Sequence, residues 1–161
     1  RPMDLIKAFG DLKVENMYLI LVGEGQLKQD MLDYIEEQKL ERIHFTGFIN
    51  QKELPKYYGL ADVLVLCSES ETWGLSVNEA MACGLPIIVS DTVGCAEDLV
   101  KEGINGFIFP KGDTIALGDA IRRVAKDKQN GNRLGLESSR IIEGFTIERT
   151  AEGFLTAAMA I

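Results

Sequence analysis

The chain has 161 residues, of which 46% are hydrophobic and 26% are charged, and its net charge is −8. This length and composition suit one globular domain with a proper core. The acidic balance argues against general nucleic-acid binding, and the longest uncharged apolar runs are too short to span a bilayer.

The cysteines and the single histidine argue against disulfide, metal and histidine-based chemistry. Cys67, Cys83 and Cys95 are odd in number and lack C-x-x-C spacing, so they are predicted to be reduced packing residues of a cytoplasmic protein. The only histidine, His44, lies in the strand-like run I-H-F-T-G, where a structural role is favoured. No metal cluster can be assembled from this inventory.

Short, almost entirely apolar runs alternate with longer amphipathic segments along the chain. The apolar runs predict strands at Met17–Val22, Ile43–Phe45, Asp62–Cys67, Pro86–Ser90 and Gly106–Phe109. The amphipathic segments predict helices at Met3–Leu12, Gln26–Leu40, Gln51–Leu60, Leu75–Cys83, Gly94–Glu102, Thr114–Lys126, Arg133–Ile142 and Thr146–Ile161. This alternation predicts an α/β fold with a doubly wound parallel sheet, in a single domain over residues 1–161.

Such sheets bind ligands at the carboxyl ends of their strands, which directs attention to the loop after Cys67. This loop reads S-E-S-E-T-W-G-L-S and enters a helix near Leu75. Gly74 would let a ligand approach the backbone, and the unpaired N–H groups of the first helical turn can bind a phosphate or a sugar hydroxyl. Glu79, about one turn into the helix, is predicted to accept hydrogen bonds from two ribose hydroxyls. Glu71, before the helix, would face sugar hydroxyls or developing positive charge.

The residues of this loop also have structural interpretations. Glu71 and Glu79 could each serve only the helix macrodipole. Trp73 could stack on a ligand or form an aromatic lid over the loop. In the helix that follows, the run A-M-A-C-G is predicted to let the helix lie close on the sheet, with Gly84 as its left-handed terminator.

The other strand-end loops offer weaker signals. Gly23 and Gly25 form a short G-x-G that either borders a nucleotide or only makes a tight turn. Phe48 and Ile49 either contact a base or pack in the core. The segment D-T-V-G-C-A-E-D places Gly94 and Glu97 at another helix start, where they are candidates for ligand contacts. The alternative is a structural role for this segment, in which Asp91 or Thr92 caps the helix.

Taken together, these motifs resemble the C-terminal domain of retaining GT-B glycosyltransferases, the large glycosyltransferase family 4 (glycosyl transferases group 1). The signature of that family is a Glu, seven residues, a second Glu, and then Ala-Met-Ala-x-Gly-x-Pro. It stands here as E-T-W-G-L-S-V-N-E-A-M-A-C-G-L-P. The similarity covers nearly the whole chain and includes L-V-G-E-G, F-T-G-F-I, A-D-V-L-V-L-C-S, V-G-C-A-E-D-L-V and G-I-N-G-F-I-F-P-K-G-D.

The resemblance implies a Rossmann-like domain that binds a UDP-, GDP- or ADP-sugar, with no cofactor and no metal. It implies that Glu79 binds the ribose hydroxyls and that Phe48 and Ile49 border the base, with Gly23 and Gly25 on the nucleotide side. Glu71 is the catalytic candidate. It would surround the donor sugar and the β-phosphate together with the backbone of Thr72, Trp73, Gly74, Leu75 and Ser76.

The chain departs from the family pattern at three places. Cys67 stands where the family usually has Pro, and Val93-Gly94 stands where it often has Gly-Gly. In the family a first strand carries an Arg and a Lys soon follows, and together they neutralise the diphosphate. Because this chain begins at Arg1, we expect that strand, both cations and an acceptor-binding N-terminal domain to belong to a longer parent.

The parent is then expected to transfer a hexose to an acceptor with retention of configuration, in the cytoplasm, with any attachment to the inner face of the membrane made by its N-terminal half. The isolated piece is expected to be inactive and to bind nucleotide weakly. Two alternatives are a non-enzymatic nucleotide-binding or interaction module and a nucleotide-sugar epimerase. A glycoside hydrolase fits less well, because its two carboxylates must oppose each other across the scissile bond.

Overall fold

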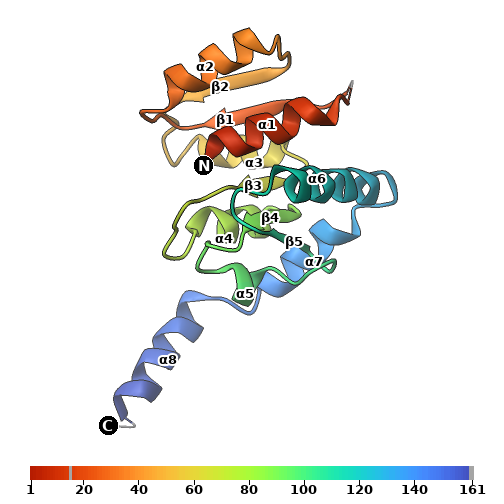
Figure 1. Ribbon diagram of the computed structural model, residues 1–161. Coiled ribbons are helices and arrows are strands. Elements are labelled where there is room, and N and C mark those ends of the chain that lie inside the picture. The colour runs from red at the N-terminus through yellow and green to blue at the C-terminus, as the bar shows by residue number, and fades with distance from the viewer. Residues whose placement is uncertain (15, 160–161) are drawn as a thin grey trace.

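The computed structural model describes residues 1–14 and 16–159, and these residues form an α/β structure (Figure 1). The strands are β1 (Leu19–Val22), β2 (Ile43–Gly47), β3 (Leu64–Leu66), β4 (Ile87–Ser90) and β5 (Gly106–Phe109). The helices are α1 (Pro2–Leu12), α2 (Lys28–Glu37), α3 (Leu54–Leu60), α4 (Leu75–Ala82), α5 (Ala96–Leu99), α6 (Thr114–Gln129), α7 (Arg133–Ile142) and α8 (Ile147–Met159). Every predicted strand and helix is present in this order. The final two residues of the predicted helix Thr146–Ile161 lie outside the described residues.

All strand pairs are parallel, but they form two pieces of sheet. β1 pairs with β2, while β4 lies between β3 and β5. Within the described residues, β1 has no strand partner other than β2, and β3 has none other than β4. The doubly wound parallel arrangement is confirmed, with the difference that its hydrogen-bonded ladder is interrupted between β1 and β3.

The central strand β4 is buried on both faces and shows how the layers are built. Ile88 packs in a cluster with the inward faces of α1 and α6, whereas Ile87 and Val89 pack in a second cluster with α4 and α5. A strand that is apolar on both faces therefore has helices on both sides, as parallel sheets require. The first cluster also takes in Leu19 of β1 and the partly buried Val65 of β3, so apolar packing continues across the interruption in the ladder.

Helix α4 lies tightly on its face of the sheet, as its small residues predict. Val77, Ala80 and Met81 are fully buried. Gly84 has φ of 74° and ends the helix in the left-handed conformation. The close packing of α4 on the sheet fixes the position and direction of its amino end, where the candidate site lies.

Helix α5 is shorter than the predicted Gly94–Glu102. The backbone N–H groups of Gly94 and Cys95 donate to the loop after β3, and the helix begins after them, at Ala96. At the other end, the buried side chain of Asn105 accepts from the N–H of Lys101 and donates to the carbonyl of Leu99. These bonds replace the next helical turn, and the helix covers Ala96–Leu99 only.

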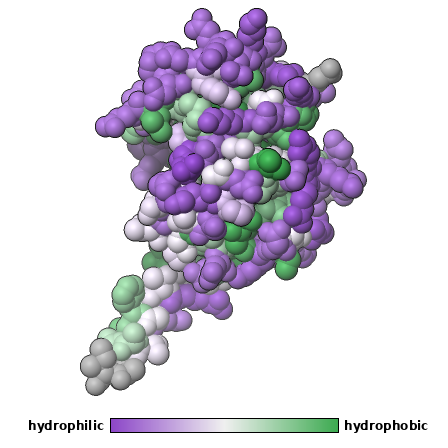
Figure 2. All heavy atoms as spheres, in the orientation of Figure 1, coloured by the Kyte–Doolittle hydropathy of each residue, from purple (hydrophilic) through white to green (hydrophobic). Residues whose placement is uncertain are grey.

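Helix α8 projects away from the rest of the chain (Figure 1), and none of its described residues is buried. Figure 2 shows apolar residues gathered on this projection, whereas hydrophilic residues dominate the visible face of the body. The exposed apolar side chains of α8 are Ile147, Phe154, Leu155 and Met159. Among the described residues, no helix combines the length and apolar character needed to cross a membrane.

Candidate functional site

The loop after β3 is held in place by backbone bonds to the segment after β4. The N–H of Gly94 donates to the carbonyl of Glu71 at 2.9 Å, and the N–H of Cys95 donates to the carbonyl of Trp73 at 2.9 Å. Glu71 and Val93 form an isolated parallel bridge. The loop is therefore an ordered extension of the sheet's carboxyl edge.

Gly94 allows this contact because it has no side chain. A Cβ at Gly94 would lie 2.0 Å from the carbonyl oxygen of Thr72, which is far shorter than a Cβ approaches any non-bonded heavy atom. The backbone at position 94 can therefore lie this close to the Thr72 carbonyl only if residue 94 is glycine. This fixes the height of the loop above the sheet.

The loop delivers the chain to the amino end of α4 in the way the sequence predicts. Gly74 is the N-cap residue, with φ of 101°, and none of the described side chains caps the helix. The N–H of Val77 donates to the Gly74 carbonyl, so the N–H groups of Leu75 and Ser76 are the ones that an added acceptor can meet. A helix amino end without a capping side chain favours an anion.

Glu79 lies one turn further along α4, on an exposed position. One of its carboxylate oxygens, Oε2, accepts a hydrogen bond of 2.7 Å from the hydroxyl of Tyr58. Tyr58 belongs to α3 and is only 8% exposed. Nothing in the sequence marks Tyr58 as part of this site, because its partner lies 21 residues away and no local pattern links the two residues.

Glu71 and Trp73 have local partners. The carboxylate of Glu71 accepts from the backbone N–H of Trp73 at 3.3 Å and from the Thr72 hydroxyl at 3.4 Å, which are long bonds. The indole N–H of Trp73 donates to the side chain of Asn78 at 2.9 Å, and the ring packs against the apolar cluster beneath α4. This packing favours the aromatic lid over a ring that stacks on a ligand.

The loops after β1 and β2 meet each other at the same edge. The N–H of Gly23 donates to the carbonyl of Gly47 at 2.9 Å, and φ of Gly23 is 115°. Phe48 follows directly and is 77% exposed, so it does not pack in the core; Ile49 is half-buried. Gly25 accepts from the N–H of Lys28 in the turn that leads to α2. The structure thus brings Gly23, Gly47 and Phe48 together, with an exposed aromatic face available to a ligand.

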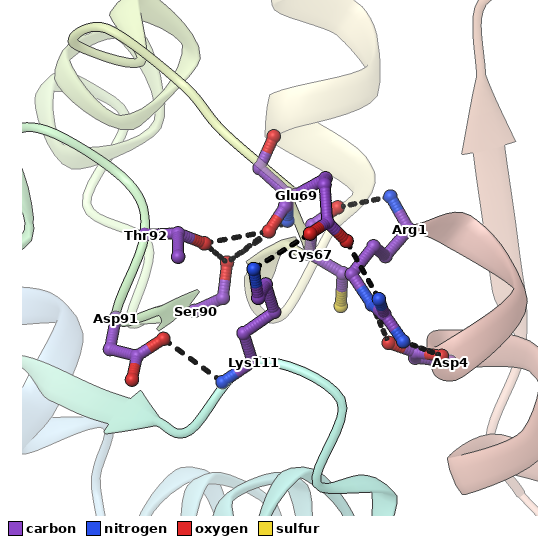
Figure 3. A network of polar contacts seen from close by, with 9 residues as sticks. Arg1, Asp4, Cys67, Glu69, Ser90, Asp91, Thr92 and Lys111 are labelled. Atoms are coloured by element: carbon purple, nitrogen blue, oxygen red, sulfur yellow. Dashed lines mark hydrogen bonds and ion pairs between the residues drawn. The ribbon is translucent and has the colours of Figure 1, made fainter.

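A network of charged and polar groups joins the ends of β3, β4 and β5 to the start of α1 (Figure 3). The carboxylate of Glu69 binds two cations, the guanidinium of Arg1 at 2.7 Å and the ammonium of Lys111 at 2.6 Å. Arg1 also binds the Asp4 carboxylate. The hydroxyl of Thr92 donates to the carbonyl of Ser68 at 2.7 Å.

The same network corrects one expectation. Asp91 and Thr92 do not cap α5, because the Asp91 carboxylate accepts from the backbone N–H of Lys111 and the Thr92 hydroxyl is bound to Ser68. No side chain among the described residues caps α5. Both side chains instead tie the ends of neighbouring strands together beside the loop after β3.

Glu69 should make the chain sensitive to acid. Hydrogen bonds from Lys111 and Arg1 lower the pKa of Glu69 from its ordinary value of 4.5 to about 2. A carboxyl whose pKa falls on folding stabilises the fold above its unfolded pKa, and this contribution is lost as the pH drops from about 4.5 towards about 2. The effect should be small and should weaken in high salt, since Glu69 is exposed.

We therefore expect Glu69→Gln to flatten the pH dependence of the free energy of unfolding in this window. Urea unfolding at several pH values would measure it, with Glu36→Gln on the exposed face of α2 as the matched control. Equal slopes for Glu69→Gln and the unmodified chain would show that the Glu69 ion pairs do not persist in solution.

All three cysteines are free thiols, as the sequence predicts. Cys95 is buried and Cys67 is partly buried, but Cys83 is exposed, so the expectation that it packs in the core is wrong. Burial raises the pKa of Cys67 to about 12 and that of Cys95 to about 11, so both stay protonated and inert at neutral pH. Within the described part of the chain, no three His, Cys, Asp or Glu side chains lie close enough to hold a metal ion.

Comparison with known proteins identifies the family. The sequence profile of the glycosyl transferases group 1 family matches residues 1–140. The chain belongs to this family. It is 29% identical over 159 residues to the N-acetyl-alpha-D-glucosaminyl L-malate synthase of Bacillus anthracis, a match that covers 97% of this chain and 41% of that enzyme. It is 31% identical to the sulfoquinovosyl transferase of Arabidopsis thaliana over 84% of this chain and 26% of that protein.

Solved structures of glycosyltransferases share the fold. Sucrose-phosphate synthase from Thermosynechococcus elongatus superposes on 99% of this chain and 42% of its own, with a TM-score of 0.82 and 27% identity. Anabaena HepE, solved in complex with UDP, covers 98% of this chain and 44% of its own, with a TM-score of 0.82 and 25% identity. The resemblance to the C-terminal domain of GT-B glycosyltransferases is thereby confirmed. In each of these comparisons the chain spans less than half of the relative's length.

Proposed function

We propose that this member of the glycosyl transferases group 1 family is the donor-binding part of a retaining hexosyltransferase that uses a nucleoside diphosphate sugar. The observation that carries the proposal is the uncapped amino end of α4, which begins at a left-handed Gly74 with Glu71 before it and Glu79 one turn after it. UDP in the HepE complex, bound to a protein with this fold, supports a nucleotide ligand for the present chain.

Each part of the donor has a partner that suits its chemistry. The β-phosphate would accept from the N–H groups of Leu75 and Ser76, where the helix macrodipole favours negative charge. A carboxylate beside a phosphate would repel it, so Glu79 would instead bind the neutral ribose hydroxyls. Phe48, exposed after β2, would lie against the base. Glu71 would then face the donor sugar.

In the parent enzyme, catalysis would come from positioning the donor and from stabilising the charge of the leaving diphosphate. The loop that carries Glu71 suits this role, because backbone bonds from Gly94 and Cys95 hold it before any ligand arrives. A group that is already in place costs no reorganisation when charge develops on the leaving group.

The interrupted ladder supports the expectation that the donor site is incomplete without further chain. β1 and β3 each have one unpaired edge in the described structure, and α1 begins beside the carboxyl end of β3, where Arg1 binds Glu69. A parallel strand that precedes α1 and lies between β1 and β3 would complete the sheet by a right-handed crossover. We propose that this strand, the expected phosphate-binding Arg and Lys, and the acceptor-binding domain belong to the parent, so that the 161-residue chain alone is inactive.

A binding screen tests the proposal. The chain is titrated with UDP-glucose, GDP-glucose and ADP-glucose, and binding is followed by ligand-observed NMR. We expect weak binding of one of these donors and no release of sugar from any of them. Absence of binding to all three would contradict the proposed function. Release of sugar from an aryl glycoside without nucleotide would favour a hydrolase instead.

A further inference from the structure

We infer that Tyr58 is the positioning residue for the ribose-binding carboxylate of Glu79, and that it makes the site prefer ribonucleotides to 2′-deoxyribonucleotides. The inference rests on the proposed function, because it takes Glu79 as the acceptor for the ribose hydroxyls. It adds Tyr58, on a different helix from Glu79, to the proposed nucleotide site, and it gives Tyr58 part of the discrimination between ribose and 2′-deoxyribose.

The hydrogen bond from Tyr58 occupies one oxygen of the Glu79 carboxylate and leaves the other oxygen available. The hydroxyl of Tyr58 donates to Oε2 of Glu79 at 2.7 Å, which is the length of a charge-assisted hydrogen bond. Glu79 itself is exposed on α4, where a free side chain would sample several rotamers. Because Tyr58 binds one oxygen, the carboxylate is held in one orientation, and Oε1 and the remaining lone pair of Oε2 are left for a ligand.

Tyr58 can hold Glu79 because its own position is fixed. Tyr58 is 8% exposed, and its side chain packs in the cluster that includes Val77 and Met81 of α4. Burial, and then the nearby Glu79 carboxylate, raise the pKa of Tyr58 above its ordinary value. The phenol therefore keeps its proton at neutral pH, and it acts as the donor towards the carboxylate of Glu79.

Tyr58 also connects the ribose side of the site to the base side. It lies on α3, the helix that follows β2, and the connection between β2 and α3 contains Phe48 and Ile49. Asn50 orders this connection, since its side-chain oxygen accepts from the N–H groups of Lys52 and Glu53. The segment that would border the base and the group that orients Glu79 thus belong to one short stretch of chain.

The test measures how well the chain distinguishes ribose from 2′-deoxyribose. Dissociation constants for UDP and for 2′-deoxy-UDP are measured by NMR titration on the unmodified chain, Tyr58→Phe and Tyr57→Phe. Phenylalanine keeps the buried ring and removes only the hydroxyl, and the neighbouring Tyr57 on α3 is the matched control. The readout is the ratio of the two dissociation constants, because a variant that merely loosens the fold should weaken both nucleotides equally.

We expect the unmodified chain and Tyr57→Phe to prefer UDP, and Tyr58→Phe to lose about tenfold of that preference, as expected for one hydrogen bond to a charged group. An unchanged ratio in Tyr58→Phe would overturn the inference. Glu79→Ala separates this failure from that of the proposed function. If Glu79→Ala removes the preference while Tyr58→Phe retains it, only the positioning role is wrong. If the unmodified chain shows no preference, or Glu79→Ala leaves it intact, the ribose role of Glu79 is wrong and the inference fails with it.

Discussion

Gly94→Ala is expected to weaken donor binding by on the order of tenfold or more, because a small displacement of groups that contact a ligand is costly. The added Cβ would meet the carbonyl oxygen of Thr72 at 2.0 Å and that of Glu71 at 3.2 Å. Both atoms belong to the backbone, so no rotamer change can relieve the contact. The loop must move away from the sheet, and it would carry the carboxylate of Glu71 with it.

Two measurements separate this local effect from unfolding. Binding of UDP is followed by NMR titration, and the free energy of unfolding is measured in urea, where an overpacked site should cost roughly 1–3 kcal/mol. Gly153→Ala is the control, since a Cβ at that position of α8 has no neighbour within 4 Å. An affinity equal to that of the unmodified chain would mean that the position of the loop does not matter for the ligand.

Gly106→Ala should have the largest effect on stability, lowering the free energy of unfolding by about 3 kcal/mol. Gly106 begins β5 and lies opposite Ile87 in the register of the sheet. A Cβ here would lie 1.9 Å from the carbonyl oxygen of Ile87, in the strand that is buried on both faces. The strands would have to separate at this point, and no flexible side chain is present to absorb the change.

The midpoint of urea unfolding measures this loss, which is a large share of the roughly 5–15 kcal/mol that a domain of this kind has in total. Gly59→Ala provides the control, because Gly59 lies within α3 and a Cβ there has open space. Alanine is the better helix former, so that variant should be as stable as the unmodified chain or slightly more stable. A midpoint for Gly106→Ala equal to that of Gly59→Ala would contradict the close strand contact.

Much of the fold is readable in the sequence because local pattern and long-range packing agree. The runs predicted as strands at Ile43–Phe45 and Gly106–Phe109 are short and largely apolar, and each lies in a strand of the structure. Two boundaries differ from the prediction at places where hydrogen bonds that the apolar pattern does not reveal order the chain. The N–H of Gly94 donates to the carbonyl of Glu71 on the loop after β3, and α5 begins only at Ala96. Helix α3 starts at Leu54, after Asn50 has ordered the turn at residues 51–53.

The candidate site likewise combines local features, which the sequence predicts, with contacts between distant segments, which it does not predict. The glycine at the start of α4 and the spacing of Glu71 and Glu79 are local features, and the sequence alone predicts their positions. The hydrogen bond from Tyr58 to Glu79 and the ion pairs of Glu69 join segments far apart in the chain. No periodicity links these residues, since they meet only when α1, α3 and the ends of three strands are brought to one edge of the sheet.

The most direct test of the account is the affinity of Glu79→Ala for UDP, beside that of the unmodified chain. Removal of this carboxylate is expected to weaken UDP binding by about tenfold or more, because the ribose hydroxyls lose their charged acceptor. The fold should be retained, since Glu79 is exposed on its helix. An unchanged dissociation constant in a folded Glu79→Ala chain would contradict the account.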